Sequence, residues 1–215
     1  MDRVPEADAL LADVRARNRP LPSPPTGDEL EDLALPEDQI AVRAVHAIAR
    51  EPASKYNPLF LYGPEDDGRS ALLAAAARRL MRDHPGLTVA YLRGAEFAEE
   101  LIHALEKNEV ESWRTRYRRA GALFVDGIDA LERTERAQEE LFHLFDALVR
   151  SGAQLVFGAT RAPGELDGLE DRLRSRLEAG LVTGVEDAAP AAPTSEAGTM
   201  VVTDEGDIAV VEPDA

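Results

Sequence analysis

The stretch GPEDDGRS, residues 63–70, has residue types at a spacing that suits phosphate chemistry. Gly63 and Gly68 enclose four residues, and the hydroxyl of Ser70 follows. This is the G-x-x-x-x-G-K-[ST] pattern, in which backbone N–H groups cradle phosphates at a helix N-terminus and the hydroxyl contacts magnesium. Arg69 stands at the lysine position, so the charge is kept while a compact ammonium becomes a bulkier planar guanidinium. The stretch indicates a phosphate-binding loop with an altered cation.

Three acids inside this loop, Glu65, Asp66 and Asp67, oppose phosphate binding. A carboxylate about 4 Å from a phosphate charge costs on the order of 1 kcal/mol in water and several at a lower dielectric. Three such charges outweigh the single Arg69 unless they turn outward or magnesium bridges one of them. We therefore expect either no nucleotide cofactor or weakly held ATP or ADP with magnesium.

The elements around the loop predict an α/β fold. Strands are expected at residues 57–63, 87–94, 122–128, 153–160 and 181–186, and helices at 38–50, 70–86, 95–121, 134–152 and 168–180. The helix at 95–121 is expected to break near Asn108. Alternating strands and helices imply crossover connections and a mostly parallel sheet, whose ligands bind at the carboxyl ends of the strands. Gly63, Asp126 and Thr160 each fall at or just after a strand end, so one site could include all three.

Composition limits the other classes of function. The chain has 215 residues, 44% of them apolar, and no cysteine, which excludes a disulfide framework and a thiolate metal site. No apolar run approaches the roughly 18 residues of a membrane span, and the N-terminus lacks the apolar region of a signal peptide. We expect a cytoplasmic protein. The four histidines show no metal-binding spacing, and no Ser/His/Asp arrangement is indicated.

Charge and low-complexity segments divide the chain. The net charge is −17, and eight acids without a base lie from Glu186 onward, so the chain as a whole repels nucleic-acid phosphates. Prolines at positions 20, 22, 24 and 25 exclude a regular helix in that stretch. We expect a flexible segment at 1–27, a folded core at 28–187, and an acidic linker with a possible β-hairpin at 188–215.

Several motifs resemble one known family. They are YNPLFLYG, ALEKNEVESWRTRYRRAGALFVDGIDAL, TERAQEELFHLFDAL and GLEDRLRSRLEAGL. In order, from about Leu30 to Glu186, they resemble the AAA+ domain of the bacterial replication initiator DnaA. The resemblance implies the parallel-sheet αβα core of a P-loop NTPase. DnaA continues into a helical lid and a helix-turn-helix domain; here about thirty residues remain, so we expect neither the lid nor duplex-specific DNA binding.

By this resemblance the nucleotide pocket has lost several parts. The cofactor-binding positions are Gly63, Gly68, Arg69, Ser70, Asp126 and Thr160, with Ser70 and Asp126 as magnesium ligands. Gly127 replaces the second acid of the Walker B motif, and a missing general base typically lowers a rate by about 10²–10⁴. Thr160 replaces a sensor acid, and ALPED at residues 34–38 lacks the glycine beside the adenine. We expect a pseudo-ATPase, with no catalytic set intact.

The resemblance also assigns an arginine finger, a residue that acts on a neighbour's nucleotide and needs none of its own. In EDRLRSRLEAG the finger is Arg176 and its companion is Arg172. The alternative is an exposed helix on which the three arginines at 172, 174 and 176 pair with Glu170, Asp171 and Glu178.

A third set of residues suggests single-stranded DNA. The segment ALEKNEVESWRTRYRRAG resembles the helical insert that lines the DNA channel of initiators, and the family's contact positions fall on Ile102 and Arg136. Arginines at 114, 116, 118 and 119 accompany Trp113 and Tyr117, which would supply charge and stacking. Trp113 and Tyr117 lie four residues apart, however, so they could equally be core residues.

Three functions follow from these patterns. The leading hypothesis is a DnaA-like module with a degenerate nucleotide site that regulates initiation of chromosomal replication by docking on an initiator or another AAA+ protein. The alternatives are an ATP- or ADP-binding regulator of the Hda type and a single-stranded DNA-binding module.

Overall fold

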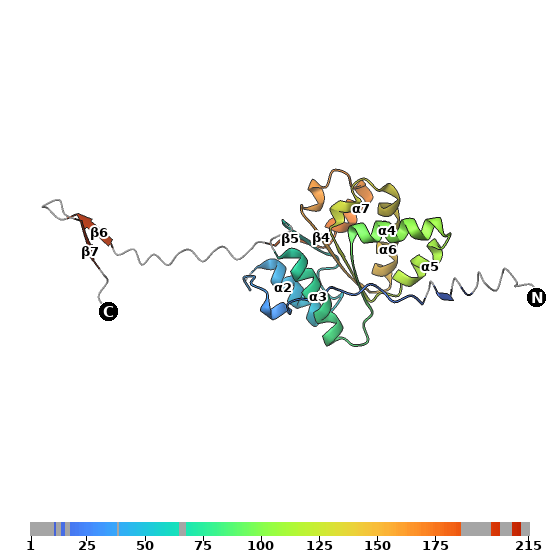
Figure 1. The fold of residues 1–215 in the computed structure, drawn as a ribbon, viewed down its shortest axis with the longest axis horizontal. Coiled ribbons are helices and arrows are strands. Elements are labelled where there is room, and N and C mark those ends of the chain that lie inside the picture. The colour runs from blue at the N-terminus through green and yellow to red at the C-terminus, as the bar shows by residue number, and fades with distance from the viewer. Residues whose placement is uncertain are drawn as a thin grey trace, which may run out of the picture.

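The computed structural model describes residues 11, 14–15, 18–37, 39–64, 68–185, 199–202 and 208–211. The elements follow one another from η1 to β7 (Figure 1). The helices are η1 (Leu30–Asp32), α2 (Ile40–Arg50), α3 (Arg69–Asp83), α4 (Gly94–Glu106), α5 (Val110–Tyr117), η2 (Ile128–Leu131), α6 (Glu135–Arg150), η3 (Pro163–Glu165) and α7 (Asp171–Glu178). The strands are β1 (Leu59–Tyr62), β2 (Val89–Arg93), β3 (Ala122–Asp126), β4 (Gln154–Ala159), β5 (Leu181–Gly184), β6 (Thr199–Val202) and β7 (Ile208–Val211).

The first five strands form one parallel sheet in the order β2-β3-β4-β1-β5. Each connection between them crosses over through helices, as parallel pairing requires. The sheet confirms the predicted α/β class. Its carboxyl edge collects the ends of β1, β3 and β4, which is where the sequence placed the candidate site.

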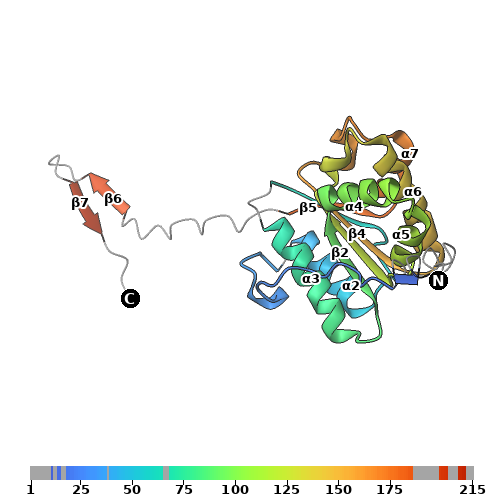
Figure 2. The same cartoon turned by 45° about the vertical axis from the view of Figure 1, so that its right-hand side comes forward.

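Helices cover both faces of this sheet, giving an αβα sandwich (Figure 1, Figure 2). Side chains of one strand alternate between the faces. Leu59 and Leu61 pack in the core beneath α2 and α3, whereas Phe60 packs in the core beneath α4, α6 and α7. Each face of the sheet therefore packs on its own hydrophobic core, and both cores support the carboxyl edge.

Two helix boundaries can be compared with the sequence. The expected break near Asn108 is confirmed: α4 ends at Glu106, α5 begins at Val110, and Asn108 has a φ of 56°. The helix expected at 38–50 begins at Ile40 in the structure, after Gln39, and Asp38 lies outside the described residues.

Residues 19–28 form an extended strap along the free edge of β2. The Tyr91 amide donates to Pro22 O at 2.9 Å. Arginines from three places donate to carbonyls of the strap: Arg78 to Pro25 O at 2.6 Å, Arg116 Nε to Pro20 O at 3.0 Å, and Arg119 to Arg19 O at 3.1 Å. The expectation of a flexible segment at 1–27 did not anticipate these contacts, and residues 1–10 are not described.

After Val185 the described residues are those of β6 and β7, which pair antiparallel with Thr199 opposite Val211. The acidic residues from 186 to 198 lie outside the described part of the chain. None of the described segments forms a helical lid after Gly184. No helix in the described ranges is long and apolar enough to cross a bilayer.

Candidate nucleotide site and arginine surface

A cavity of about 1150 Å³ opens at the carboxyl ends of β2 and β3, between the first turns of α3 and α4. The strap forms one of its walls. The polar groups that matter below are contributed by Arg69, Ser70, Tyr91, Asp126 and Asp129. The structure therefore brings Walker A and Walker B positions to one cavity, as the topology predicts.

The two glycines of the expected phosphate loop lie between β1 and α3. Gly63 follows β1, and Gly68 precedes α3 with a left-handed φ of 73°, a conformation that favours glycine. A side chain at Gly68 would lie 3.3 Å from Leu35 Cδ2. Thus Leu35, from the altered ALPED turn, packs on the loop. The acidic residues 65–67 are outside the described residues, so their expected effect on phosphate stays a prediction.

Arg69 does not extend from the loop toward solvent. It is 2% exposed, and its Nη1 donates to Gly63 O at 2.7 Å. Its Nη2 lies 3.3 Å from Ser70 Oγ and 3.3 Å from Asp126 Oδ1. The guanidinium is thus held by both halves of the site. Sequence reasoning predicted its charge but not this inward direction.

Asp126 is buried at the end of β3, with the side chain 8% exposed. Gly158 on β4 makes room for it, because a Cβ at that position would lie 2.7 Å from Asp126 Oδ1. Burial raises the pKa of the Tyr91 hydroxyl above its ordinary value of 10, and the Asp126 carboxylate beside it raises that pKa further. Tyr91 therefore stays neutral and faces the carboxylate as a hydroxyl.

Gly127, at the position of the second Walker B acid, has a φ of 75° and a ψ of 52° and leads into η2. Its amide donates to Gly158 O at 2.8 Å. No atom lies within 4 Å of a Cβ built there. An acid at 127 would therefore have space but would adopt a left-handed backbone, which costs about 1–2 kcal/mol for most residues.

Thr160 reaches the site through Asp129, a residue that sequence reasoning missed. The Thr160 amide and hydroxyl contact Asp129 Oδ1 at 2.7 Å and 3.4 Å. Asp129 lines the cavity, whereas Thr160 is not among its lining residues. The signal was present in VDGID, where a second carboxylate follows Asp126 by one short turn.

In this site the charges of Arg69 and Asp126 neutralise each other. Ser70 Oγ and the Asp126 carboxylate are the oxygen ligands that magnesium prefers. The same Arg69 nitrogen lies 3.3 Å from both, which is where such a cation would bind. These residues therefore do not fit a metal ion while Arg69 keeps its contacts. Gly127 has no carboxylate that could activate water.

The α7 arginines lie on the surface away from this cavity. Arg172 and Arg176 have side chains 45% and 47% exposed. Arg172 pairs with Glu170 at 2.6 Å, and Arg176 Nε pairs with Asp146 Oδ1 at 3.0 Å. Two of the ion pairs expected in the alternative are present, Arg172 with Glu170 and Arg174 with Asp171. Arg176, however, pairs with α6 rather than with Glu178.

The fold and these sites match one family. The profile described as the bacterial DnaA ATPase domain matches residues 33–184. The chain belongs to the DnaA family. Domain III of DnaA from Thermotoga maritima is 31% identical with a TM-score of 0.70, and the match covers 74% of this chain and 66% of that one.

Other DnaA structures agree. AMPPCP-bound DnaA from Aquifex aeolicus is 32% identical with a TM-score of 0.69; the match covers 74% of this chain and 49% of that one. This chain thus spans about half the length of that initiator. The DnaC helicase loader, 10% identical with a TM-score of 0.63 over 74% of this chain and 96% of its own, shares the fold alone. The AAA+ resemblance read from the sequence is confirmed.

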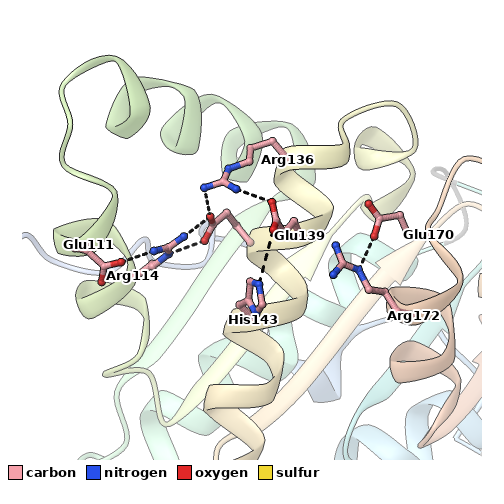
Figure 3. Close-up of polar contacts among 8 residues, drawn as sticks. Glu111, Arg114, Arg136, Glu139, His143, Glu170 and Arg172 are labelled. Atoms are coloured by element: carbon pink, nitrogen blue, oxygen red, sulfur yellow. Dashed lines mark hydrogen bonds and ion pairs between the residues drawn. The ribbon is translucent and has the colours of Figure 1, made fainter.

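In this DnaA-family chain the residues suggested for DNA carry an ionic network between α5 and α6 (Figure 3). Arg114 Nε donates to Glu140 at 2.7 Å, and Arg114 also pairs with Glu111. Arg136 Nη2 lies 2.8 Å from the same Glu140, and Arg136 also pairs with Glu139. Three carboxylates thus surround two guanidiniums. The charge expected at Arg136 is already balanced, while Ile102 on α4 is 50% exposed.

Trp113 and Tyr117 are core residues, so their expected role as stacking groups for bases is corrected. They are 6% and 0% exposed and pack with Phe97, at 5.2 Å between the ring centroids of Phe97 and Trp113. Arg116 is also buried, paired with Glu100 at 2.9 Å. Helical spacing of four residues placed both aromatic rings on the inward face of α5.

Proposed function

We propose that this chain is a DnaA-family module that regulates initiation of chromosomal replication by docking on the AAA+ ring of an initiator. In this proposal its own nucleotide site takes no part, and the chain acts as a pseudo-ATPase in the cytoplasm. The surface that meets the neighbour is α7, with Arg176 as the finger and Arg172 as its companion.

The Arg69–Asp126 ion pair carries the proposal. A nucleotide with magnesium needs both groups, Arg69 at the phosphates and Asp126 at the metal. Both are buried and form an ion pair with 3.3 Å between Nη2 and Oδ1, and Arg69 Nη1 donates a hydrogen bond to Gly63 O. Separating a buried pair leaves uncompensated charges and costs several kcal/mol. Ligand binding would have to provide that energy before any net affinity appears.

The exposure of Arg172 and Arg176 supports the second half of the proposal. An arginine finger must reach the phosphates of a neighbour, so its side chain has to be accessible from outside its own domain. Arg176 is 47% exposed, whereas Arg69 at the chain's own loop is 2% exposed. Of these two arginines, Arg176 is therefore the one that a neighbour's phosphate could reach.

Mixing the purified chain with the initiator of the same organism tests this function. ATP turnover and filament length are measured with wild type and with Arg176→Ala. We expect wild type to change at least one of them, by triggering hydrolysis or by limiting assembly at one end. If wild type and Arg176→Ala act alike in both assays, the finger proposal is wrong.

The Hda-type alternative is favoured by a different observation. Gly63, Gly68 and Ser70 keep the loop positions, and the cavity beside them measures about 1150 Å³. If Arg69 left Asp126, the site could hold ATP or ADP that controls association. Titration with nucleotide separates the two: micromolar binding of Mg-ATP or Mg-ADP supports the alternative.

Single-stranded DNA binding is the third candidate, since one similar DnaA structure, 32% identical, holds AMPPCP and single-stranded DNA. In this chain the exposed Ile102 favours it, whereas Arg114, Arg116 and Arg136 are paired with acids. Binding of a labelled oligonucleotide that is lost in Ile102→Ala and Arg136→Ala would support this function.

A further inference from the structure

The ring of Phe142 contacts both exposed arginines of α7. The guanidinium carbons of Arg172 and Arg176 lie 5.1 Å and 5.7 Å from the ring centroid of Phe142 on α6. These are cation–π distances, at which the ring face attracts the cation without occupying its N–H donors. Phe142 therefore holds each guanidinium near α6 and leaves its hydrogen-bonding capacity for another partner.

The two arginines differ in their acidic partners. Glu170, the partner of Arg172, immediately precedes α7 and moves with it. Asp146, the partner of Arg176, lies on α6, one helical turn after Phe142. Arg176 is thus tied to a second helix by a ring and by a carboxylate. Nε is the Arg176 nitrogen nearest to Asp146. The two terminal nitrogens of Arg176 form no hydrogen bond with any described residue.

We propose that Phe142 and Asp146 are positioning residues for Arg176, with opposite effects on its action in trans. This inference rests on the proposed function. Phe142 orients the guanidinium at the α6–α7 surface before the neighbour arrives. Asp146 holds the same guanidinium in a resting ion pair and competes with the neighbour's phosphate for its charge.

The expected effects are modest because the ion pair is half exposed. Exposed pairs contribute at most about 1 kcal/mol, equivalent to roughly fivefold in a binding constant. Asp146→Asn should therefore lower the concentration of this chain that gives half of its effect on initiator ATP turnover, by up to about fivefold. Phe142→Leu should raise that concentration by roughly two- to fivefold, since exposed cation–π contacts are worth about 0.5–1 kcal/mol.

The experiment measures initiator ATP turnover against the concentration of wild type, Arg176→Ala, Asp146→Asn, Asp146→Glu and Phe142→Leu. Asp171→Asn is the matched control, because Asp171 pairs with Arg174 on the same helix and not with the finger. We expect Asp146→Asn and Phe142→Leu to shift the half-effect concentration in opposite directions with the plateau unchanged. Asp146→Glu should restore the wild-type value, and Asp171→Asn should match wild type.

If Arg176→Ala has no effect, the proposed function fails. If Arg176→Ala removes the effect while Asp146→Asn and Phe142→Leu match wild type, the positioning inference fails and the function stands. Shifts in the same direction for those two variants would also overturn it, since damage to folding would act in that way.

Discussion

Nη2 of Arg69 lies 3.3 Å from Oδ1 of Asp126, so the cation of the phosphate loop is ion-paired with the acid that would hold its metal. Both side chains are buried, at 2% and 8% exposure. The pair joins α3 to β3 and links the two halves of the site without a ligand. Stability and nucleotide binding therefore depend on the same contact.

Removing one member of this pair should destabilise the fold. Arg69→Ala leaves Asp126 as a buried, unpaired carboxylate, and we expect the free energy of unfolding to fall by about 3–5 kcal/mol. Urea unfolding measures it. The double variant Arg69→Ala with Asp126→Ala should recover part of the loss, because no charge is left uncompensated. Equal additive losses would show that the two side chains do not interact.

Nucleotide binding should be weak in the wild-type chain. We expect a Kd for Mg-ATP above about 100 µM, which corresponds to roughly −5.5 kcal/mol, and no turnover. The reasons are the Arg69–Asp126 pair, the glycine at 127 and the acids at 65–67. Calorimetric titration gives the affinity. Micromolar binding would refute the claim about affinity, and turnover that Asp126→Ala abolishes would refute the claim about catalysis.

Repair of the loop should restore some affinity but not catalysis. The variant carries Glu65→Gly, Asp66→Val, Asp67→Gly and Arg69→Lys. Turnover should additionally require Gly127→Asp, which carries a cost because Gly127 has a φ of 75°. We expect Gly127→Asp alone to lower stability by about 1–2 kcal/mol. Failure of the loop variant to bind ATP in the same titration would place the defect elsewhere in the pocket.

Acid should weaken the α5–α6 contact through Glu140. Burial alone would raise the pKa of this carboxyl, yet hydrogen bonds and charge from Arg114 and the charge of Arg136 lower the pKa below 4.5. A lowered native pKa gives stability that is complete above pH 4.5 and is lost as pH falls through the native value.

Urea unfolding of wild type and Glu140→Gln should therefore differ most near neutral pH and converge below pH 4.5. Glu139→Gln is the control, since Glu139 is 37% exposed and should matter little. A difference between wild type and Glu140→Gln that is constant with pH would exclude this role for the carboxylate.

Hydrophobic periodicity and turn residues were enough to predict the five parallel strands and the break at Asn108. The same patterns placed Gly63, Asp126 and Thr160 at one edge of the sheet, and the family resemblance added Ser70 to that site. The direction of Arg69 was beyond the sequence, because a long side chain can reach either a ligand or a neighbouring strand. The strap was missed for another reason. Prolines exclude a helix, but they leave carbonyls free, and the arginines that bind those carbonyls are as much as 100 positions away.

The proposed function requires that the chain bind an initiator through α7 without using its own nucleotide site. The most direct measurement is the affinity of wild type, Ser70→Ala and Arg176→Ala for the ATP-bound initiator of the same organism, immobilised on a sensor surface. Ser70→Ala removes the hydroxyl that would contact magnesium at the chain's own loop. We expect Ser70→Ala to bind like wild type and Arg176→Ala to bind at least tenfold more weakly. Loss of binding in Ser70→Ala with Arg176→Ala unchanged would contradict the proposed function.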